Sequence, residues 1–431
     1  MINGVVIEHI GATNNNLVGI NKTMNDTYVL YKKDTTDHLL IILCPCTFCN
    51  NSCVYCMSQG DKNSSFIMPL NVLKAAIKKI YAMPGLNKIT YCWHSGEPLF
   101  AGLNYYRSAL QIIERFHPSD INFEYTIQTN GTLLNDEWAL FFKDYNFTVG
   151  VSLDGPAKIH NKQRKSKDGK GSFNKTIAGV ETLAKHNVRG GALCVITRNT
   201  LKYPADDLFH FFRDRKIDIN YLIEAKIGAN RNNPNTLSIK DIPNLRVYLK
   251  RLFELWLEFS DVYIKDFNML VTRLFDPTFL NVELNNAGCL DILNINPDGT
   301  FFFGNPELAG TIDERFGNFN YGNVIYDNLM DVRQSIPFIR QQQEIFAGIE
   351  KCKQECLYFA GCRGGNSAHK YFQFNRFDVS SHLTCELNDK IIIELFVSAL
   401  EDEFLEEKKE TDLFLPNNSL HRMARNGVRR R

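Results

Sequence analysis

The sequence carries almost no net charge and has no long apolar run. Its 49 lysine and arginine residues nearly balance 48 aspartate and glutamate residues, which leaves a net charge of +1 at pH 7. Such a chain lacks the overall basic field that attracts nucleic acid, so we expect no nucleic-acid partner. No apolar run reaches the roughly 18 residues that a membrane span requires, so we expect no membrane partner either.

The first residues also lack the pattern of a secretory signal, which is a charged leader, an apolar core and a small-residue cleavage site. We therefore expect a cytoplasmic protein. Its twelve cysteines gather at short intervals, and in the reducing cytosol this indicates metal ligands rather than disulfides. The 431 residues, 44% of them hydrophobic, are enough for two or three domains with a sizeable core.

Three cysteines follow an apolar run over residues 39–43, at gaps of three and two residues: Cys49, Cys53 and Cys56. Iron-sulfur clusters ordinarily take four thiolates, so three cysteines would leave one iron open. The alternatives are half of a zinc site or thiols that are simply buried, although this spacing is unusual for zinc. Cys44 and Cys46 lie outside the pattern, and we expect them not to be ligands.

Strand-like runs alternate with helical patterns from residue 39 to about residue 224. The expected strands cover residues 39–43, 88–93, 123–128, 147–153, 191–196 and 219–223. The expected helices lie near residues 70–83, 104–116, 135–144, 174–187 and 204–215. This alternation predicts an α/β fold in which helices cover a parallel sheet, and six units fit a partial (β/α)6 TIM-like barrel. In such barrels the chemistry occurs at the C-terminal ends of the strands.

Polar motifs follow three of the expected strands. They are His94-Ser95-Gly96-Glu97-Pro98, Thr126-Ile127-Gln128-Thr129-Asn130-Gly131, and Ser152-Leu153-Asp154-Gly155-Pro156 with His160 and Arg164 downstream. Each motif alone is compatible with an ordinary turn. Their order and spacing behind the three-cysteine motif resemble those of the radical S-adenosylmethionine (SAM) enzymes.

This resemblance implies that Cys49, Cys53 and Cys56 hold a 4Fe-4S cluster whose open iron takes the amino and carboxylate groups of SAM. An electron from the cluster then cleaves SAM to a radical that abstracts hydrogen, and a flavodoxin- or ferredoxin-type protein is the implied electron donor. The residues that the resemblance assigns to SAM binding are Tyr55, Ser95, Gly96, Glu97, Gln128, Asn130, Ser152 and Arg164. Among them Glu97 would bind the ammonium of SAM, and Arg164 would pair with its carboxylate.

A second group of cysteines lies toward the C-terminus: Cys352, Cys356, Cys362 and Cys385. By spacing alone these four thiols suit zinc and an iron-sulfur cluster equally well. Behind the radical SAM motifs they resemble the SPASM domain of enzymes that modify peptides and proteins, which implies one auxiliary 4Fe-4S cluster. Most ligands of a second auxiliary cluster are missing, so we expect Cys289 to be a free buried thiol.

The resemblance also bears on the reaction. Sulfatase-maturating relatives carry an aspartate as general base where this chain has Asn305, and an amide cannot accept the proton. Five segments resemble instead the branch that makes cyclophane crosslinks: residues 93–99, 306–310, 322–324, 356–359 and 362–365. This implies an oxidoreductase that joins an aromatic side chain to a nearby β-carbon of a ribosomally made precursor peptide. Glu224 and Glu307 are the candidates for the base.

Two other functions stay open. The same radical chemistry also produces thioethers, epimerised residues, or oxidised serine or cysteine as in sulfatase maturation, whereas a zinc-stabilised binding protein would have no catalysis. The expected organisation is an N-terminal extension (residues 1–36), a radical SAM core (37–240), a bridging helical region (241–284), a SPASM-like domain with a C-terminal helix (285–407) and a basic tail (408–431).

Overall fold

The computed structural model describes residues 37–56, 66–275 and 290–410, which belong to one compact unit. The expected N-terminal extension, Cys289 and most of the basic tail lie outside these residues. In the part of the chain that is described, no helix combines the length and the apolar character needed to cross a membrane.

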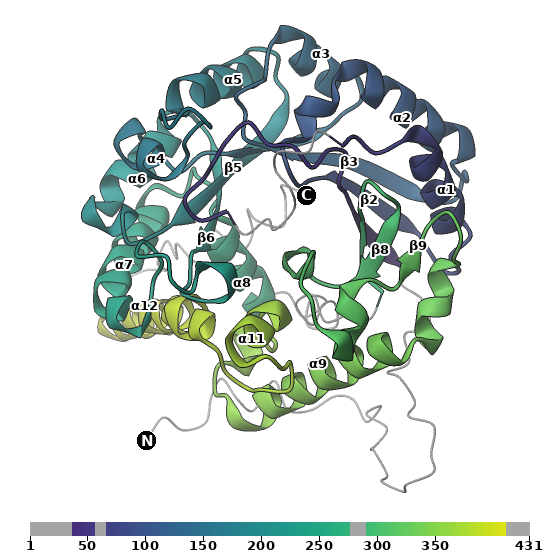
Figure 1. The fold of residues 1–431 in the computed structure, drawn as a ribbon. Coiled ribbons are helices and arrows are strands. Elements are labelled where there is room, and N and C mark those ends of the chain that lie inside the picture. The colour runs from purple at the N-terminus through teal and green to yellow at the C-terminus, as the bar shows by residue number, and fades with distance from the viewer. Residues whose placement is uncertain (1–36, 57–65, 276–289, 411–431) are drawn as a thin grey trace, which may run out of the picture. The chain divides into compact units, whose positions relative to one another are not determined.

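Six parallel strands with helices on their outer face form the core, which confirms the α/β fold class (Figure 1). The strands are β1 (His38–Leu43), β2 (Lys88–Trp93), β3 (Asn122–Thr129), β4 (Thr148–Ser152), β5 (Arg189–Ile196) and β6 (Asp218–Ile223). Each strand pairs in parallel with the next; Leu43 of β1, for example, lies opposite Trp93 of β2. All six expected strands are present, with ends that agree to within two residues.

The covering helices follow the expected order with one addition. They are α1 (Leu70–Tyr81), α2 (Leu103–Phe116), α3 (Asp136–Asp144), α4 (Ala157–Gln163), α5 (Phe173–Lys185) and α6 (Ala205–Arg213). The helix that the sequence did not predict is α4, a segment of seven residues whose one large apolar side chain is Ile159. It is too short to show the apolar periodicity of a helix.

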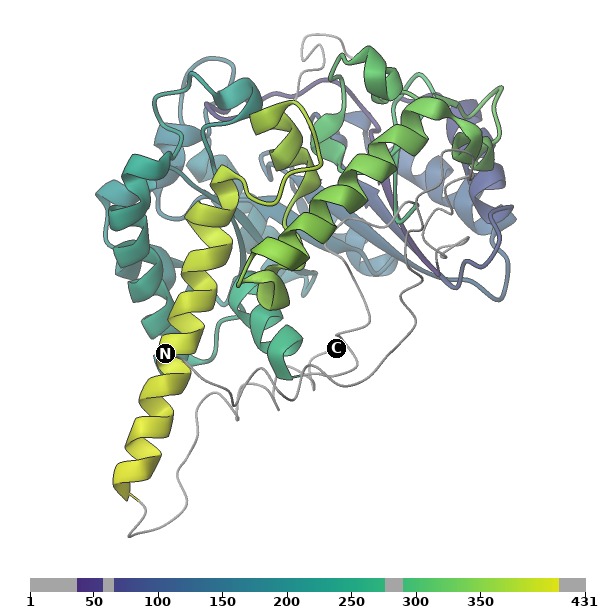
Figure 2. The same cartoon turned by 90° about the horizontal axis from the view of Figure 1, so that it is seen from below.

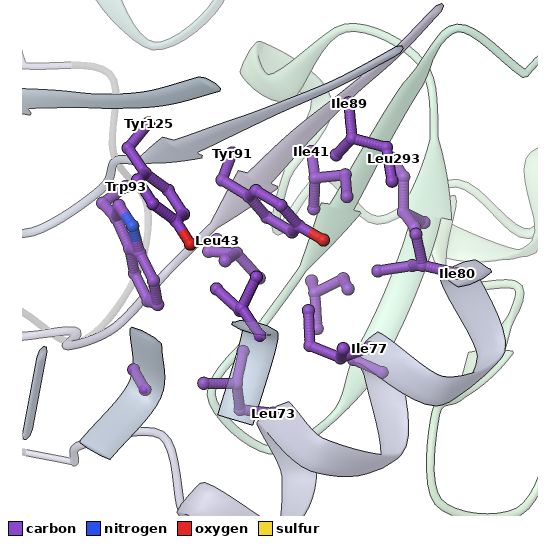
Figure 3. Packing of buried hydrophobic residues seen from close by; sticks show 14 of the residues in the cluster. Ile41, Leu43, Leu73, Ile77, Ile80, Ile89, Tyr91, Trp93, Tyr125 and Leu293 are labelled. Carbon is purple, nitrogen blue, oxygen red and sulfur yellow. The ribbon is translucent and has the colours of Figure 1, made fainter. Parts of the chain in front are cut away.

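The apolar spacing of α1 shows why these segments fold as they do. Leu73, Ile77 and Ile80 recur every three or four residues, so they share one helix face, and all three are fully buried. In Figure 3 this face packs against Ile41 and Leu43 of β1, which are also fully buried. The apolar runs of the strands and the helical period of α1 therefore meet in one core.

The C-terminal region extends the same sheet. Strand β7 (Ile292–Ile295) pairs in parallel with β1, and β8 (Thr300–Phe303) and β9 (Gly322–Asn323) follow antiparallel. The full order is β6-β5-β4-β3-β2-β1-β7-β8-β9. The sequence analysis predicted neither β7 nor its place beside β1. The predicted domain boundaries stay a prediction.

Further helices complete the C-terminal region. They are α7 (Ile242–Phe259), α8 (Lys265–Phe275), α9 (Ile336–Glu355), α10 (Phe359–Cys362), α11 (Ser367–Phe374) and α12 (Lys390–Glu410), the last preceded by a π-helical turn, Cys385–Asp389. Short 3-10 turns cover Pro98–Ala101, Thr200–Lys202, Gly228–Asn230, Ile239–Asp241, Pro306–Leu308, Glu314–Phe319 and Leu329–Gln334. Figures 1 and 2 show α12, in yellow, beside α7, where Phe253 and Phe396 pack at a ring distance of 5.2 Å.

Candidate active site

A cavity of about 1080 Å³ lies at the C-terminal ends of the parallel strands. Its wall includes segments that follow β1, β2, β3, β4 and β6, together with residues of α8, α11 and the turn that precedes α12. This is the edge where the barrel geometry predicts chemistry, since the strands of such folds point their C-terminal ends toward the active site.

The first three cysteines line this cavity on the loop after β1. Cys49 and Cys53 are half-buried and Cys56 is exposed. Burial raises the pKa of Cys53 to about 11; the thiols of Cys56 and Cys49 add to this effect, whereas Arg164 opposes it. The three sulfurs are thus near enough to interact electrostatically and open to the cavity, beside a buried cation, which fits an anionic cluster with three thiolate ligands. Among the described residues, no three His, Cys, Asp or Glu side chains converge closely enough to hold a single metal ion.

Gly96 lets the cysteine loop pack against the end of β2. Its φ angle is +59°, and a Cβ atom there would lie 2.3 Å from the Cys46 carbonyl oxygen and 2.7 Å from that of Phe48. A side chain therefore does not fit without moving the backbone of the loop. This close approach is between two protein segments, and it positions the loop that carries the cysteines.

Glu97 lies behind the cavity wall. Only 1% of the residue is exposed, it is not among the residues that line the cavity, and burial raises its pKa. Its carboxylate accepts hydrogen bonds from Thr129 Oγ1 at 2.6 Å, the Asn130 amide at 2.8 Å and the Leu99 amide at 3.1 Å. These bonds join the end of β2 to the end of β3. A direct contact of Glu97 with SAM stays a prediction.

Three other predicted SAM residues lie together on the cavity wall. Gln128 Nε2 donates to Ser152 Oγ at 3.0 Å, across the ends of β3 and β4. Asn130 Nδ2 donates to Asn50 Oδ1 at 2.7 Å and lies 3.9 Å from Cys49 Sγ. The strand ends are therefore connected directly to the first cysteine of the loop.

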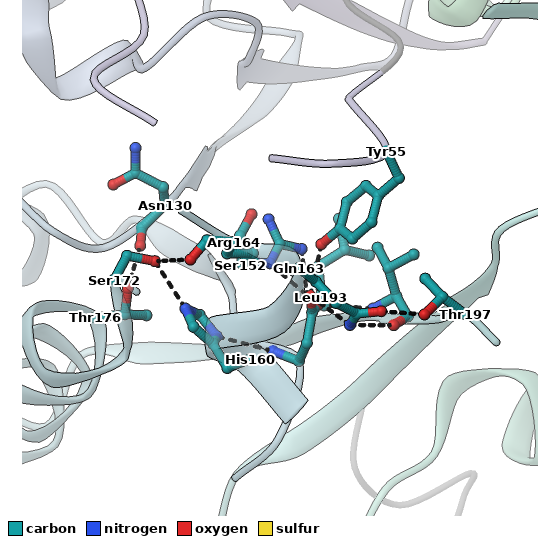
Figure 4. Close-up of polar contacts among 12 residues, drawn as sticks. Tyr55, Asn130, Ser152, His160, Gln163, Arg164, Ser172, Thr176, Leu193 and Thr197 are labelled. Atoms are coloured by element: carbon teal, nitrogen blue, oxygen red, sulfur yellow. Dashed lines mark hydrogen bonds and ion pairs between the residues drawn. The ribbon is translucent and has the colours of Figure 1, made fainter. Parts of the chain in front are cut away.

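Asp154 is the centre of the polar network behind this wall, part of which Figure 4 shows. It is fully buried and accepts hydrogen bonds from Tyr55 Oη at 2.6 Å, the Val195 amide at 2.9 Å and Gln163 Nε2 at 3.0 Å. Arg164 Nε lies 3.1 Å from the same carboxylate, and the guanidinium lies 5.3 Å from the Tyr55 ring centroid. Asp154 thus holds Tyr55 and Arg164, two of the predicted SAM residues. The sequence analysis missed this role of Asp154, because the motif that contains it is also compatible with an ordinary turn.

His160 belongs to the same network and has a structural place in it. It is fully buried; its Nδ1 accepts from the Asp154 amide at 3.3 Å, and its Nε2 lies 2.9 Å from Ser172 Oγ. Burial lowers the pKa of His160 to about 4, so its ring is neutral at physiological pH. In Figure 4 His160 lies on α4 and joins this helix to the segment that begins α5.

Both predicted bases lie on the cavity wall. Glu224 follows β6, and burial together with the charge of Glu307 raises its pKa to about 8. Glu307 Oε2 lies 3.1 Å from His369 Nε2, and this neighbour lowers the pKa of Glu307 although burial opposes the shift. Near neutral pH, Glu307 is therefore ionised and Glu224 is protonated. His369, on α11, is a site residue that the sequence reasoning missed.

Asn305 stands two residues before Glu307 but does not line the cavity. It is 5% exposed; its Oδ1 accepts from the Glu307 amide at 2.9 Å, and its Nδ2 donates to Asn366 Oδ1 at 3.0 Å. Both ends of the amide are therefore used to hold the turn that carries Glu307.

The C-terminal cysteines form a buried group. Cys352, Cys362 and Cys385 are at most 7% exposed, and burial raises the pKa of Cys362 to about 11, with contributions from Asp389, Cys356 and Cys352. Lys370, which is 2% exposed, places its Nζ 3.3 Å from Cys352 Sγ. Four neighbouring thiols with a buried amine beside them suit the four-thiolate cluster that the resemblance implied.

Comparisons with known proteins agree with this geometry. The family model of the Radical SAM superfamily matches residues 43–210. The Synechocystis "Uncharacterized protein sll1766" is 33% identical over 375 residues, which cover 84% of this chain and 92% of that protein. The cysteine-type anaerobic sulfatase-maturating enzyme of Clostridium novyi is 28% identical over 372 residues, which cover 82% of this chain and 91% of that enzyme.

A solved structure, native anSMEcpe with bound AdoMet and Cp18Cys peptide, has a similar fold. Its TM-score is 0.70 at 23% identity, and the match covers 85% of this chain and 99% of that chain. At this identity the likeness supports the fold alone. The fold match includes the C-terminal region, since it extends over far more of the chain than the barrel core.

Proposed function

Since this chain belongs to the radical SAM superfamily, we propose that it removes two hydrogens from a peptide or protein substrate. Members of this superfamily are enzymes that use SAM and a 4Fe-4S cluster. When bound, these groups supply the abstraction of a hydrogen atom from the substrate. The observation that carries the proposal is that the ionised carboxylate of Glu307 shares one cavity with the three-cysteine loop.

The cavity has room for a substrate beside SAM. Its volume of about 1080 Å³ is slightly above the roughly 300–1,000 Å³ that pockets for a single small molecule occupy. It extends from Cys53 on the loop after β1 to His369 and Cys362 in the C-terminal region. A peptide segment that lies between these walls would reach both the SAM residues and Glu307.

Glu307 suits the role of proton acceptor. A side chain that has lost one hydrogen atom from its β-carbon must still lose a proton and an electron to become a closed-shell product. Glu307 is ionised and accepts that proton, whereas the protonated Glu224 does not. The residues that would hold an auxiliary cluster, whose chemistry is to accept the electron, are Cys352, Cys356, Cys362 and Cys385.

The relatives favour serine or cysteine oxidation as the reaction, because a sulfatase-maturating enzyme aligns over 82% of this chain. In that reaction a serine CH₂OH group becomes an aldehyde and loses two hydrogens. One leaves as a hydrogen atom from the β-carbon, and the hydroxyl hydrogen leaves as a proton plus an electron.

A carbon-carbon crosslink is the second candidate, and it is favoured by the presence of an amide, Asn305, where the maturases carry their aspartate base. Its amide is buried in two hydrogen bonds and cannot take a proton, so the direct analogy with the maturases fails at this position. In the crosslink, a β-carbon that has lost a hydrogen atom bonds to an aromatic ring carbon. The ring hydrogen then leaves as a proton plus an electron, so the substrate again loses two hydrogens.

Anaerobic coexpression with a short peptide encoded beside the gene, and separately with a sulfatase, tests both candidates by high-resolution tandem mass spectrometry. A serine aldehyde keeps complete backbone fragmentation and reacts with a carbonyl reagent; a crosslink removes the fragments between an aromatic residue and a residue two positions later. Cys53→Ala is the control, since it should abolish either product. If no mass change in either substrate depends on Cys53, the proposed function is wrong.

Glu307→Gln tests the base. We expect it to slow product formation by about 100-fold or more, the typical effect of losing a general base, while SAM is still cleaved. Glu224→Gln is the matched comparison. It replaces a carboxyl that is already neutral near pH 7, so it should retain more activity than Glu307→Gln. Equal activities of the two variants would contradict the assignment.

A further inference from the structure

A chain of polar side chains, an ion pair followed by two hydrogen bonds, runs from Glu307 toward Cys385. Glu307 Oε2 lies 3.1 Å from His369 Nε2, and the other nitrogen of that ring, Nδ1, lies 2.8 Å from Thr384 Oγ1. The same hydroxyl lies 2.9 Å from His382 Nδ1. The hydroxyl of Thr384 therefore stands between two imidazole rings, and all four side chains belong to residues that line the cavity.

The far end of this chain borders the predicted auxiliary cluster site. His382 is 3% exposed, and within the described residues its Nε2 has no hydrogen-bond partner. A Cβ atom added to Gly365 would lie 2.7 Å from this nitrogen and 3.5 Å from Cys385 Sγ, so both atoms border the same point. Buried polar atoms are rarely left without a partner, which indicates that something bound at this site contacts Nε2.

The hydroxyl between the two rings allows two hydrogen-bond arrangements, because it donates only one hydrogen. When His369 is neutral and carries its hydrogen on Nε2, the nitrogen 3.1 Å from Glu307 Oε2, Thr384 donates to His369 Nδ1 and accepts from His382 Nδ1. The neutral His382 then has a bare Nε2. When the Glu307–His369 pair gains a proton, His369 Nδ1 donates to Thr384, which donates to His382 Nδ1. The neutral His382 then carries its hydrogen on Nε2.

We propose that Thr384 couples the protonation of the Glu307–His369 pair to the auxiliary cysteine site, through the tautomer of His382. This inference rests on the proposed function, in which Glu307 receives the substrate proton. With the pair protonated, His382 presents an N–H donor beside Cys385, and donors near cluster sulfurs favour the reduced cluster. One proton to Glu307 and one electron to the cluster account for the second hydrogen that the substrate loses.

Other charged groups also act on this chain. Glu224 interacts with Glu307, Asp389 interacts with His369, and Lys370 interacts with His382. Asn366 Nδ2 lies 3.4 Å from His369 Nε2, farther than Glu307 Oε2 at 3.1 Å. Glu307 Oε2 is the nearer atom and is negatively charged, so as an ion-pair partner it stabilises a hydrogen on Nε2, although the ring N–H is not aligned with it as a hydrogen bond. The hydroxyl of Thr384 is the connection between the Glu307–His369 pair and His382.

The test is an EPR-monitored redox titration of the auxiliary cluster over a range of pH, in a reconstituted full-length chain in which Cys49, Cys53 and Cys56 are alanine. With Thr384 intact, we expect the midpoint potential to become more positive as pH falls. Thr384→Val keeps the shape but removes the hydroxyl, and it should abolish most of this dependence. Thr384→Ser keeps the hydroxyl and should preserve it.

His369→Gln is a second variant, which does not adjoin a cysteine and should also abolish most of the dependence. If Thr384→Val fails to assemble its cluster, the pH dependence of the midpoint potential in His369→Gln tests the proposal instead. The proposal is overturned if Thr384→Val, or His369→Gln in its place, keeps the full pH dependence of the midpoint potential. It is also overturned if the chain that lacks only the first three cysteines shows no pH dependence, or if that chain binds no iron. No substrate is present, so these outcomes are separate from those of the peptide-modification experiment.

Discussion

Removal of the Asp154 carboxylate should destabilise the fold strongly, although this residue lies behind the cavity wall. In Asp154→Ala, the buried Arg164 loses its ion-pair partner, and three donors lose their acceptor: Tyr55, Gln163 and the Val195 amide. Breaking a buried pair on one side typically costs about 3–5 kcal/mol, because the remaining charge stays buried. Each unpaired donor costs roughly 1–3 kcal/mol, but these costs overlap, so we expect a loss of about 3–5 kcal/mol in all.

Urea unfolding of the reduced chain without cofactors, followed by far-UV circular dichroism, measures this loss. Asp168→Ala is the matched control, since that carboxylate is 57% exposed and its ion pair with Lys170 has a distance of 3.7 Å. Its effect should stay within about 0.5 kcal/mol. Asp154→Ala should also weaken SAM binding, because Tyr55 and Arg164 lose their common anchor. Coincident unfolding curves for the two variants would refute the assigned role of Asp154.

Two further predictions concern the cavity wall. Gly96→Ala should lower both the unfolding midpoint and SAM binding, because its Cβ would lie 2.3 Å from the Cys46 carbonyl oxygen. Gly102→Ala, with φ of +82° but nothing within 4 Å of the added Cβ, should cost only its backbone strain, roughly 1–3 kcal/mol. The loss in Gly96→Ala should exceed that in Gly102→Ala in paired thermal unfolding, and equal losses would show that the close approach is not tight. Burial raises the pKa of Glu224 from its ordinary value of 4.5 to about 8. Between these pH values the native state therefore keeps a proton that the unfolded state has released. The free energy of unfolding consequently falls as pH rises through this window, by at most about 1.4 kcal/mol per pH unit. Glu224→Gln should remove this slope in denaturant titrations at pH 5, 6, 7 and 8, and an unchanged slope would mean that Glu224 is ionised throughout.

The parallel strands were predictable because they appear in the sequence as short apolar runs that alternate with helical patterns. The helices of the core were predictable where their period is strong, as on α1, whose buried Leu73, Ile77 and Ile80 repeat at helical spacing. Helix α4 has seven residues, and local apolar pattern carries little information at that length. The pairing of Leu40 with Ile292 joins segments about 250 residues apart, and no local pattern encodes it.

The polar site was predictable only in part, for a related reason. The motif residues that line the cavity could be named from their order, but Asp154, His369 and Thr384 act through partners that are distant in sequence. A carboxylate directly after a buried strand was the one available signal for Asp154. For Glu97 the motif was evident, but its three donors come from the ends of β2 and β3 and appear only after folding.

The position of the base and the identity of the product are separate questions in this chain. Asn305 excludes a base at its own position, but its amide holds the turn that places Glu307, which lies on the cavity wall and is ionised. An aldehyde and a crosslink each require one proton acceptor, so the replacement at position 305 does not by itself decide between them. Loss of activity in Glu307→Gln would therefore support the base under either product, and only the fragmentation pattern of the substrate distinguishes the two reactions.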